Sequence, residues 1–92
     1  MEDRELARLR GEIDRIDGQL LALFLERMRV AGEIGAQKGR HGIAVYDGRR
    51  EAEILSRVRE QAGQEHADEA ETLFKTLMAI SRARQERERG DT

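Results

Sequence analysis

The sequence predicts an all-α fold, and three observations lead to this prediction. Apolar residues recur every three or four positions, the spacing that puts one stripe along the side of a helix. The chain contains no proline, and clusters of β-branched or aromatic residues at a spacing of two are missing. These features favour three amphipathic helices and argue against a sheet. The stripe of the first helix consists of Leu6, Leu9, Ile13, Ile16, Leu20, Leu23, Val30 and Ile34.

The composition predicts one small domain over residues 1–92. There is no cysteine, so disulfides and thiolate metal sites are excluded, and the two histidines lack metal-ligand spacing. Charged residues make up 39% of the chain, but the net charge of -2 gives no basic field to attract nucleic acid. The polar start and the lack of a long apolar run predict no signal peptide and no membrane span. We therefore expect a cytoplasmic protein.

The first element is expected to be a long helix at about 4–39. Asp3 suits its N-cap and Gly39 suits a cap position at its C-terminal end. Glycines inside an exposed helix each cost about 1 kcal/mol relative to alanine. They are either neutral surface positions or points where another backbone or a ligand comes close. The glycines inside this helix are Gly11, Gly18, Gly32 and Gly35.

A loop at 40–47 and a second helix at about 48–62 are expected to follow. Asp47 suits the N-cap of this helix, and Gly63 suits its end. The apolar face of the helix contains Ile54, Leu55 and Val58.

The third helix is expected at about 68–87. Asp68 followed by Glu71 resembles a capping box that would open it. The residues from Arg82 onward are almost all charged, and we expect this tail to fray.

The expected helix lengths favour an antiparallel homodimer. At about 1.5 Å per residue the first helix is near 50 Å long, while the second and third reach roughly 22 and 30 Å. One chain alone would leave much of the long apolar stripe bare, and a core of this size is marginal without a supplement. Pairing two long helices, with the shorter helices folded over them, would cover the stripe.

Two cations of the first helix lie where apolar residues are expected. Arg27 falls on the apolar stripe, where an unpaired charge costs on the order of several kcal/mol. Lys38 follows three turns later and points the same way. Arg10 lies seventeen residues before Arg27 and points elsewhere, so it could reach the same ligand only from a partner chain.

The shorter helices also carry polar residues at the edges of their apolar faces. Arg50 and Glu51 come one turn before Ile54, and Ser81 and Gln85 continue the apolar line of the third helix. Each residue alone has a plainer explanation, such as a solvated charge or a surface salt bridge. As a set, they suit a small dianion that also carries a hydroxyl group.

Four segments of the chain resemble the all-helical, AroQ-type chorismate mutases. They are LRGEIDRID at 9–17, LLALFLERMRVAGEIGAQK at 20–38, VYDGRREAEIL at 45–55 and LFKTLMAISRARQ at 73–85. Members of this family convert chorismate to prephenate on the route to phenylalanine and tyrosine. The resemblance implies a monofunctional enzyme of this kind, without a fused domain.

The same resemblance implies an intertwined dimer with two equivalent sites, each of which takes a residue from the partner.

Family members often have prolines near the positions of Ala44 and Gly48. This chain lacks them, so we expect a looser loop and a looser start of the second helix.

The resemblance also implies roles for the polar set at the reacting bond. Arg27 and Arg10 of the partner subunit would grip the two carboxylates of the substrate. Lys38 would contact one carboxylate and the ether oxygen, and Gln85 would donate a hydrogen bond to that same oxygen.

A second group of residues is implied at the ring. Glu51 would accept a hydrogen bond from the ring hydroxyl. Asp47, Arg50 and Ser81 match supporting positions around this hydroxyl and the carboxylates.

The implied reaction is a pericyclic rearrangement, so no nucleophile, general base, cofactor or metal is expected.

Two alternative functions stay open. One is an isochorismate pyruvate-lyase of the same fold; the other is a non-catalytic helical module that docks on another shikimate-pathway enzyme. The segment VYDGRREAEIL and Gln85 favour the mutase. Because glutamine cannot ionise, activity should vary little across neutral pH.

Overall fold

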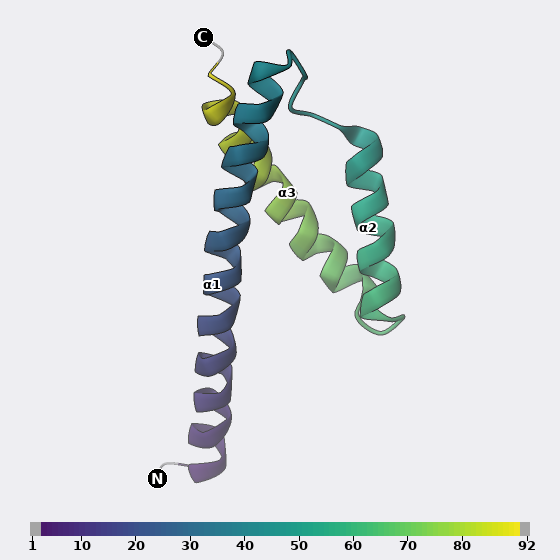
Figure 1. The fold of residues 1–92 in the computed structure, drawn as a ribbon. Helices are drawn as coiled ribbons and strands as arrows, with labels where there is room; N and C mark the ends of the chain where they lie inside the picture. The colour runs from purple at the N-terminus through teal and green to yellow at the C-terminus, as the bar shows by residue number, and fades with distance from the viewer. Residues whose placement is uncertain (1–2, 91–92) are drawn as a thin grey trace.

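The computed structural model describes residues 3–90 as three α-helices joined by two short loops (Figure 1). They are α1 at Arg4–Arg40, α2 at Gly48–Ala62 and α3 at Ala67–Arg89. Residues 3–90 contain no strand, so the predicted all-α class is confirmed. Asp91 and Thr92, the end of the expected charged tail, lie outside the described residues.

The start of α1 follows the sequence prediction, but its end differs. Asp3 caps the helix because its carboxylate accepts a hydrogen bond of 2.9 Å from the backbone N–H of Glu5. At the other end the helix continues through Gly39 to Arg40, and His41 takes the cap position predicted for Gly39.

Glycines of α1 allow the backbone of α3 to come unusually close. A Cβ on Gly35 would lie 2.4 Å from the carbonyl oxygen of Gln85, and one on Gly39 would lie 2.3 Å from that of Arg89. Gly32 lies against the side chain of Arg84, 3.0 Å from its Nε. Close approach therefore explains the glycines in the last turns of α1. A Cβ on either of the two earlier glycines, Gly11 or Gly18, would meet no atom within 4 Å apart from its own stretch of helix.

The ends of α2 are as predicted. The side chain of Asp47 accepts a hydrogen bond of 3.0 Å from the backbone N–H of Arg50 and so caps the helix. Gly63 ends it with a φ of 83°, a conformation that suits glycine.

The capping box predicted at the start of α3 is wrong. The helix begins at Ala67, after His66, whose side chain makes no cap hydrogen bond. Asp68 lies inside the first turn, and its carboxylate binds Arg59 of α2 at 2.9 Å. Glu71 binds the same guanidinium at 3.1 Å. Both carboxylates therefore link α3 to α2 instead of capping α3.

The predicted fraying of the charged tail is also wrong for residues 82–89, which are helical. α3 stays helical to Arg89 because its polar residues find partners on other elements. Arg82 forms an ion pair with Glu51 of α2, and the backbone of Gln85 packs against Gly35. The Nε of Arg89 donates a hydrogen bond of 2.8 Å to the carbonyl oxygen of Ile43 in the loop.

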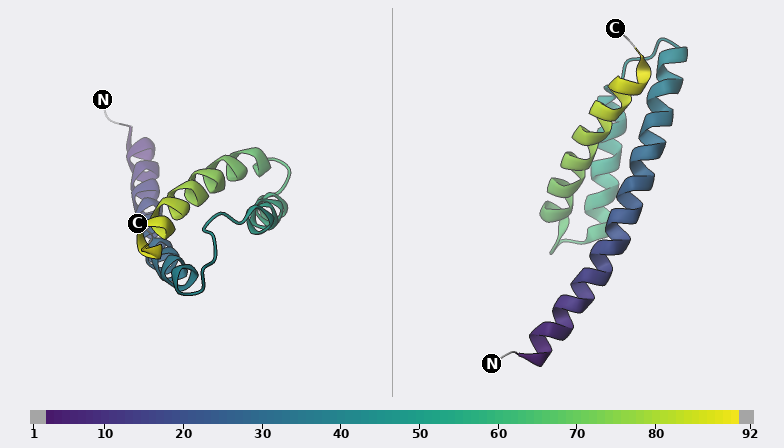
Figure 2. Two further views of the ribbon diagram at one scale, coloured as in Figure 1. Left: turned by 90° about the horizontal axis from the view of Figure 1, so that it is seen from above. Right: turned by 90° about the vertical axis from the view of Figure 1, so that its left-hand side faces the viewer.

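The three helices make an open, elongated chain. α3 packs on both α1 and α2, whereas α1 and α2 do not pack on each other within the described residues (Figures 1 and 2). The amino-terminal half of α1 extends beyond the other helices, and every residue from 3 to 23 is exposed. The radius of gyration is 17.2 Å, compared with about 12 Å for a compact domain of this length.

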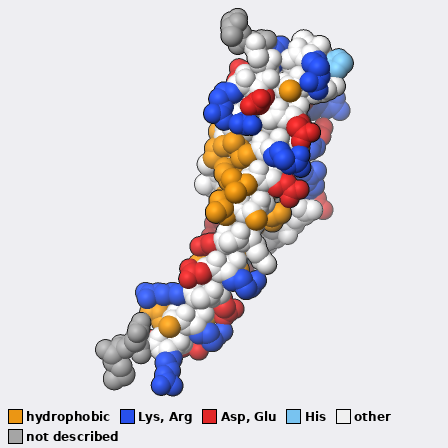
Figure 3. Space-filling view, turned by 60° about the vertical axis from the view of Figure 1, so that its left-hand side comes forward, with side chains coloured by type: hydrophobic (Ala, Val, Ile, Leu, Met, Phe, Trp, Pro, Cys, Tyr) orange, Lys and Arg blue, Asp and Glu red, His pale blue; other side chains and the backbone are white. Residues whose placement is uncertain are grey.

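Much of the apolar surface is left uncovered. Among residues 3–90 only five apolar residues are buried, and no side chain there is completely buried. Along α1, Ile13 is 56% exposed and Leu23 is 63% exposed. Figure 3 shows a group of hydrophobic side chains gathered on one face of the molecule. None of the described helices has a stretch apolar and long enough to span a membrane.

Candidate active site

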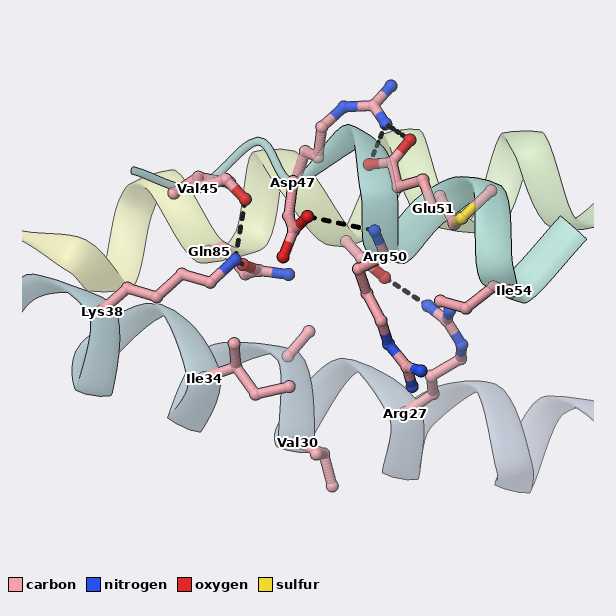
Figure 4. A pocket seen from close by; sticks show the side chains of 14 residues that line it. Arg27, Val30, Ile34, Lys38, Val45, Asp47, Arg50, Glu51, Ile54 and Gln85 are labelled. Carbon is pink, nitrogen blue, oxygen red and sulfur yellow. Dashed lines mark hydrogen bonds and ion pairs between the residues drawn. The ribbon is translucent and has the colours of Figure 1, made fainter. Parts of the chain in front are cut away.

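A cleft of about 380 Å³ lies between α1 and α2, with α3 as its floor (Figure 4). It exists because α1 and α2 both pack on α3 but not on each other. Apolar side chains from all three helices and from the loop form much of its wall. These are Val30, Ala31, Ile34, Val45, Ile54 and Met78.

All but one of the site residues predicted from the sequence line this cleft. Arg10 is the exception. It lies on the exposed half of α1 and does not line the cleft of its own chain. The residues that meet there are Arg27, Lys38, Asp47, Arg50, Glu51, Ser81 and Gln85.

Lys38 and Gln85 occupy one end of the cleft (Figure 4). The ammonium group of Lys38 donates hydrogen bonds to the carbonyl oxygen of Val45 at 2.7 Å and to Oε1 of Gln85 at 2.9 Å. An ammonium group has three N–H donors, so one is left for a ligand. Because the amide oxygen of Gln85 accepts from Lys38, its Nε2 is the group that remains to donate. This end of the cleft therefore offers two donors to an acceptor atom.

Arg27 and Arg50 lie at the other end, and the carboxylate of Asp47 points between the two ends (Figure 4). The guanidinium of Arg27 donates to the hydroxyl oxygen of Ser81, a residue that is only 6% exposed. This hydrogen bond explains how an arginine is tolerated on the apolar stripe. It uses one of the five N–H donors, so the others remain for a ligand.

Arg82 is the functional candidate that sequence reasoning missed. It lines the cleft, and its Nη1 lies 2.6 and 2.5 Å from the two carboxylate oxygens of Glu51. Its guanidinium carbon also lies 5.9 Å from the centre of the Tyr46 ring, within the range of a cation–π contact. The sequence gives no clear signal for it, because Arg82 begins a run of charged residues in which no periodicity distinguishes one arginine from the others.

The charges of the cleft favour an anionic ligand. Arg27, Lys38, Arg50 and Arg82 supply four positive charges, and Asp47 and Glu51 supply two negative ones, which leaves a net charge of +2. Within residues 3–90, no group of three or more His, Cys, Asp or Glu side chains could hold a metal ion. The cleft is thus suited to a small ligand with two negative charges.

Fold and cleft together define an all-helical protein with a small cleft of net positive charge. Comparison with known proteins is more specific. Residues 9–86 match the family model for chorismate mutase type II. The chain belongs to this family.

Three relatives illustrate the range of the family. The chain is 32% identical over 83 residues to a chorismate mutase from Methanocaldococcus jannaschii, covering 88% of this chain and 84% of that protein. It is 33% identical over 69 residues to a 4-amino-4-deoxychorismate mutase from Streptomyces venezuelae, covering 75% of this chain and 67% of that protein. It is 36% identical over 78 residues to the T-protein of Haemophilus influenzae, covering 82% of this chain. It spans only a fifth or less of the T-proteins that it matches.

Proposed function

We propose that this protein catalyses the rearrangement of chorismate to prephenate. The observation that carries the proposal is the cleft with a net charge of +2, in which arginines lie at one end and the free donors of Lys38 and Gln85 at the other. Chorismate carries two carboxylates and an ether oxygen at the bond that breaks. Membership of the chorismate mutase type II family supports the same reaction.

In this proposal, catalysis comes from holding the substrate and from stabilising the charge that develops on the ether oxygen. Arg27 and the partner's Arg10 bind the two carboxylates, and so keep the flexible enolpyruvyl arm over the ring. Lys38 and the Nε2 of Gln85 donate to the ether oxygen, where negative charge builds as the C–O bond breaks. Both donors are already oriented by their mutual hydrogen bond, so little reorganisation is needed.

The ring hydroxyl is proposed to donate a hydrogen bond to Glu51. Asp47, Arg50 and Ser81 support this arrangement. Asp47 caps α2 and so fixes the turn that carries Arg50 and Glu51. Ser81 holds the guanidinium of Arg27.

We further propose that the active form is an antiparallel homodimer. Its support is physical: residues 3–23 are all exposed, and within the described residues every member of the apolar stripe of α1 stays at least 39% exposed. A second α1 would bury this stripe and bring its Arg10 to the cleft. A cytoplasmic location, and docking on another shikimate-pathway enzyme, stay predictions from the sequence.

The loss of chorismate absorbance on addition of the purified protein tests the activity. Arg27→Ala should lower kcat/KM by about 100-fold or more, because a charged donor to the substrate is lost. Arg29→Ala is the matched control, since this side chain is 63% exposed and pairs with Glu33 on the outer surface. Release of pyruvate from isochorismate without turnover of chorismate would instead identify a lyase. Absence of both activities would favour an interaction module.

A further inference from the structure

Arg82 and Glu51 form an ion pair at the wall of the cleft. Nη1 of Arg82 binds both carboxylate oxygens of Glu51, at 2.6 and 2.5 Å. The side chains are 36% and 22% exposed, so the pair is only partly solvated. A ligand in the cleft would therefore contact a Glu51 carboxylate that is already paired with Arg82.

The pairing leaves Glu51 able to accept a further hydrogen bond. A carboxylate has about four acceptor positions, and Nη1 of Arg82 uses one on each oxygen. The guanidinium carbon of Arg82 also lies 5.9 Å from the centre of the Tyr46 ring, a cation–π contact that favours this position of the guanidinium. A neutral donor such as a hydroxyl group can thus bind Glu51 while Arg82 stays in place.

A cationic donor would be received differently. An aliphatic amine keeps its proton near neutral pH, so it presents a positive charge. The attraction of Glu51 for this charge is opposed by the repulsion of Arg82, which is held within hydrogen-bond distance of the same carboxylate. The ion pair offers a hydroxyl group its hydrogen bond, but it offers a cation little electrostatic gain.

We propose that Arg82 is a positioning residue that sets substrate specificity through Glu51: it favours a ring hydroxyl over a ring ammonium group. The two substrates concerned are chorismate and 4-amino-4-deoxychorismate, the latter named for the relative from Streptomyces venezuelae. This inference rests on the proposed function, since it takes Glu51 as the partner of the substituent in which the two substrates differ.

The test is the ratio of kcat/KM for 4-amino-4-deoxychorismate to kcat/KM for chorismate, measured for the wild type and for Arg82→Met. Methionine keeps an unbranched side chain of similar reach but removes the charge. We expect the ratio to rise by about tenfold or more, because Glu51 becomes an unpaired, partly buried anion that attracts the ammonium group. A role in folding alone would lower both values and leave the ratio unchanged.

Two further variants complete the test. Arg49→Met, the matched control, removes the same charge from a side chain on α2 that is 92% exposed, and should leave the ratio unchanged. Arg82→Lys keeps the charge and should hold the ratio near that of the wild type, and it serves even if Arg82→Met fails to fold. A ratio that stays constant in Arg82→Met, or that rises equally in Arg82→Lys, would overturn the proposal. A wild type without activity on chorismate would instead overturn the proposed function itself.

Discussion

At the scale of single residues, the polar set depends on hydrogen bonds between helices. Arg27 could be recognised in the sequence because a charge on an apolar stripe needs a partner. The structure gives it Ser81, 54 positions further along the chain. The partner of Glu51 could not be predicted in this way, because Arg82 stands in a run of charged residues where no periodicity singles out one arginine. Pairing across helices, rather than residue type, decides which charges belong to the cleft.

Gln85 leads to a prediction about pH. Glutamine does not ionise, so the wild type should keep a nearly constant kcat/KM between pH 6 and 8. A glutamate in its place must be protonated to donate a hydrogen bond, and its ordinary pKa is about 4.3. The activity of Gln85→Glu should therefore fall about tenfold for each pH unit above that pKa.

The matched control for this profile is Gln64→Glu, which adds the same charge at an exposed position of the loop between α2 and α3. It should follow the flat profile of the wild type. Parallel profiles for Gln85→Glu and the wild type, with both proteins folded, would rule out donation by residue 85.

At the scale of the helices, glycines and ion pairs position α3. The periodicity of the chain was sufficient to predict three helices, and Asp3 and Asp47 identified two of their starts. The capping box predicted at Asp68 was wrong because a carboxylate near the start of a helix can either cap that helix or pair with another one. Asp68 pairs with Arg59 of α2. The glycines near the end of α1 had two possible explanations, and only the position of α3 decides between them.

Gly35 should not tolerate a side chain. The Cβ of Gly35→Ala would meet backbone atoms of Gln85 at 2.4 to 2.9 Å, so α3 must shift away from α1. We expect a loss of about 1–3 kcal/mol in the free energy of unfolding. Turnover should also fall, because Gln85 moves relative to Lys38. Urea denaturation and the chorismate assay measure the two effects.

Gly11→Ala is the control for this substitution, because its Cβ meets no atom within 4 Å. It should leave the free energy of unfolding unchanged or raise it by up to about 1 kcal/mol through its better helix propensity. Equal behaviour of the two variants would mean that α3 does not approach α1 at Gly35.

The stability that the ion pairs of Glu71 add between α2 and α3 should depend on pH. Hydrogen bonds from Lys75 and then from Arg59 hold the pKa of the Glu71 carboxyl below its ordinary value. A lowered pKa in the folded state means that this carboxylate stabilises the fold above the ordinary pKa, and that the contribution is lost as the pH falls through the lowered value. Glu71→Gln should therefore flatten part of the acid dependence of stability.

Urea midpoints at neutral pH and at about pH 3, taken at one protein concentration, test this expectation. The control is Glu86→Gln, which changes an exposed carboxyl of the same helix. If Glu71→Gln loses as much stability between the two pH values as the wild type does, the ion pairs of Glu71 contribute nothing to the acid dependence.

At the scale of the whole molecule, one chain is elongated and leaves much of its apolar surface uncovered. Its long axis measures 60 Å and its short axis 16 Å, and it leaves Leu20 and Leu23 more than half exposed. The expected helix lengths already favoured a dimer, because two short helices cannot cover a long one. How a partner chain would be seated in the proposed dimer could not be predicted from the sequence, since it depends on two surfaces at once. Arg10 shows most clearly what the sequence of one chain leaves open. It does not line the cleft of its own chain, and its predicted role is in the cleft of a partner.

The most direct test of the account is therefore complementation between two inactive variants, Arg10→Ala and Arg27→Ala. They are unfolded, mixed in equal amounts, refolded together, and assayed for loss of chorismate. In a mixed dimer, one site receives Arg27 from one chain and Arg10 from the other, while the second site lacks both. Random pairing makes half of the dimers mixed, so the mixture should regain about a quarter of wild-type activity. A mixture no more active than the two variants refolded separately would contradict a site built from two chains.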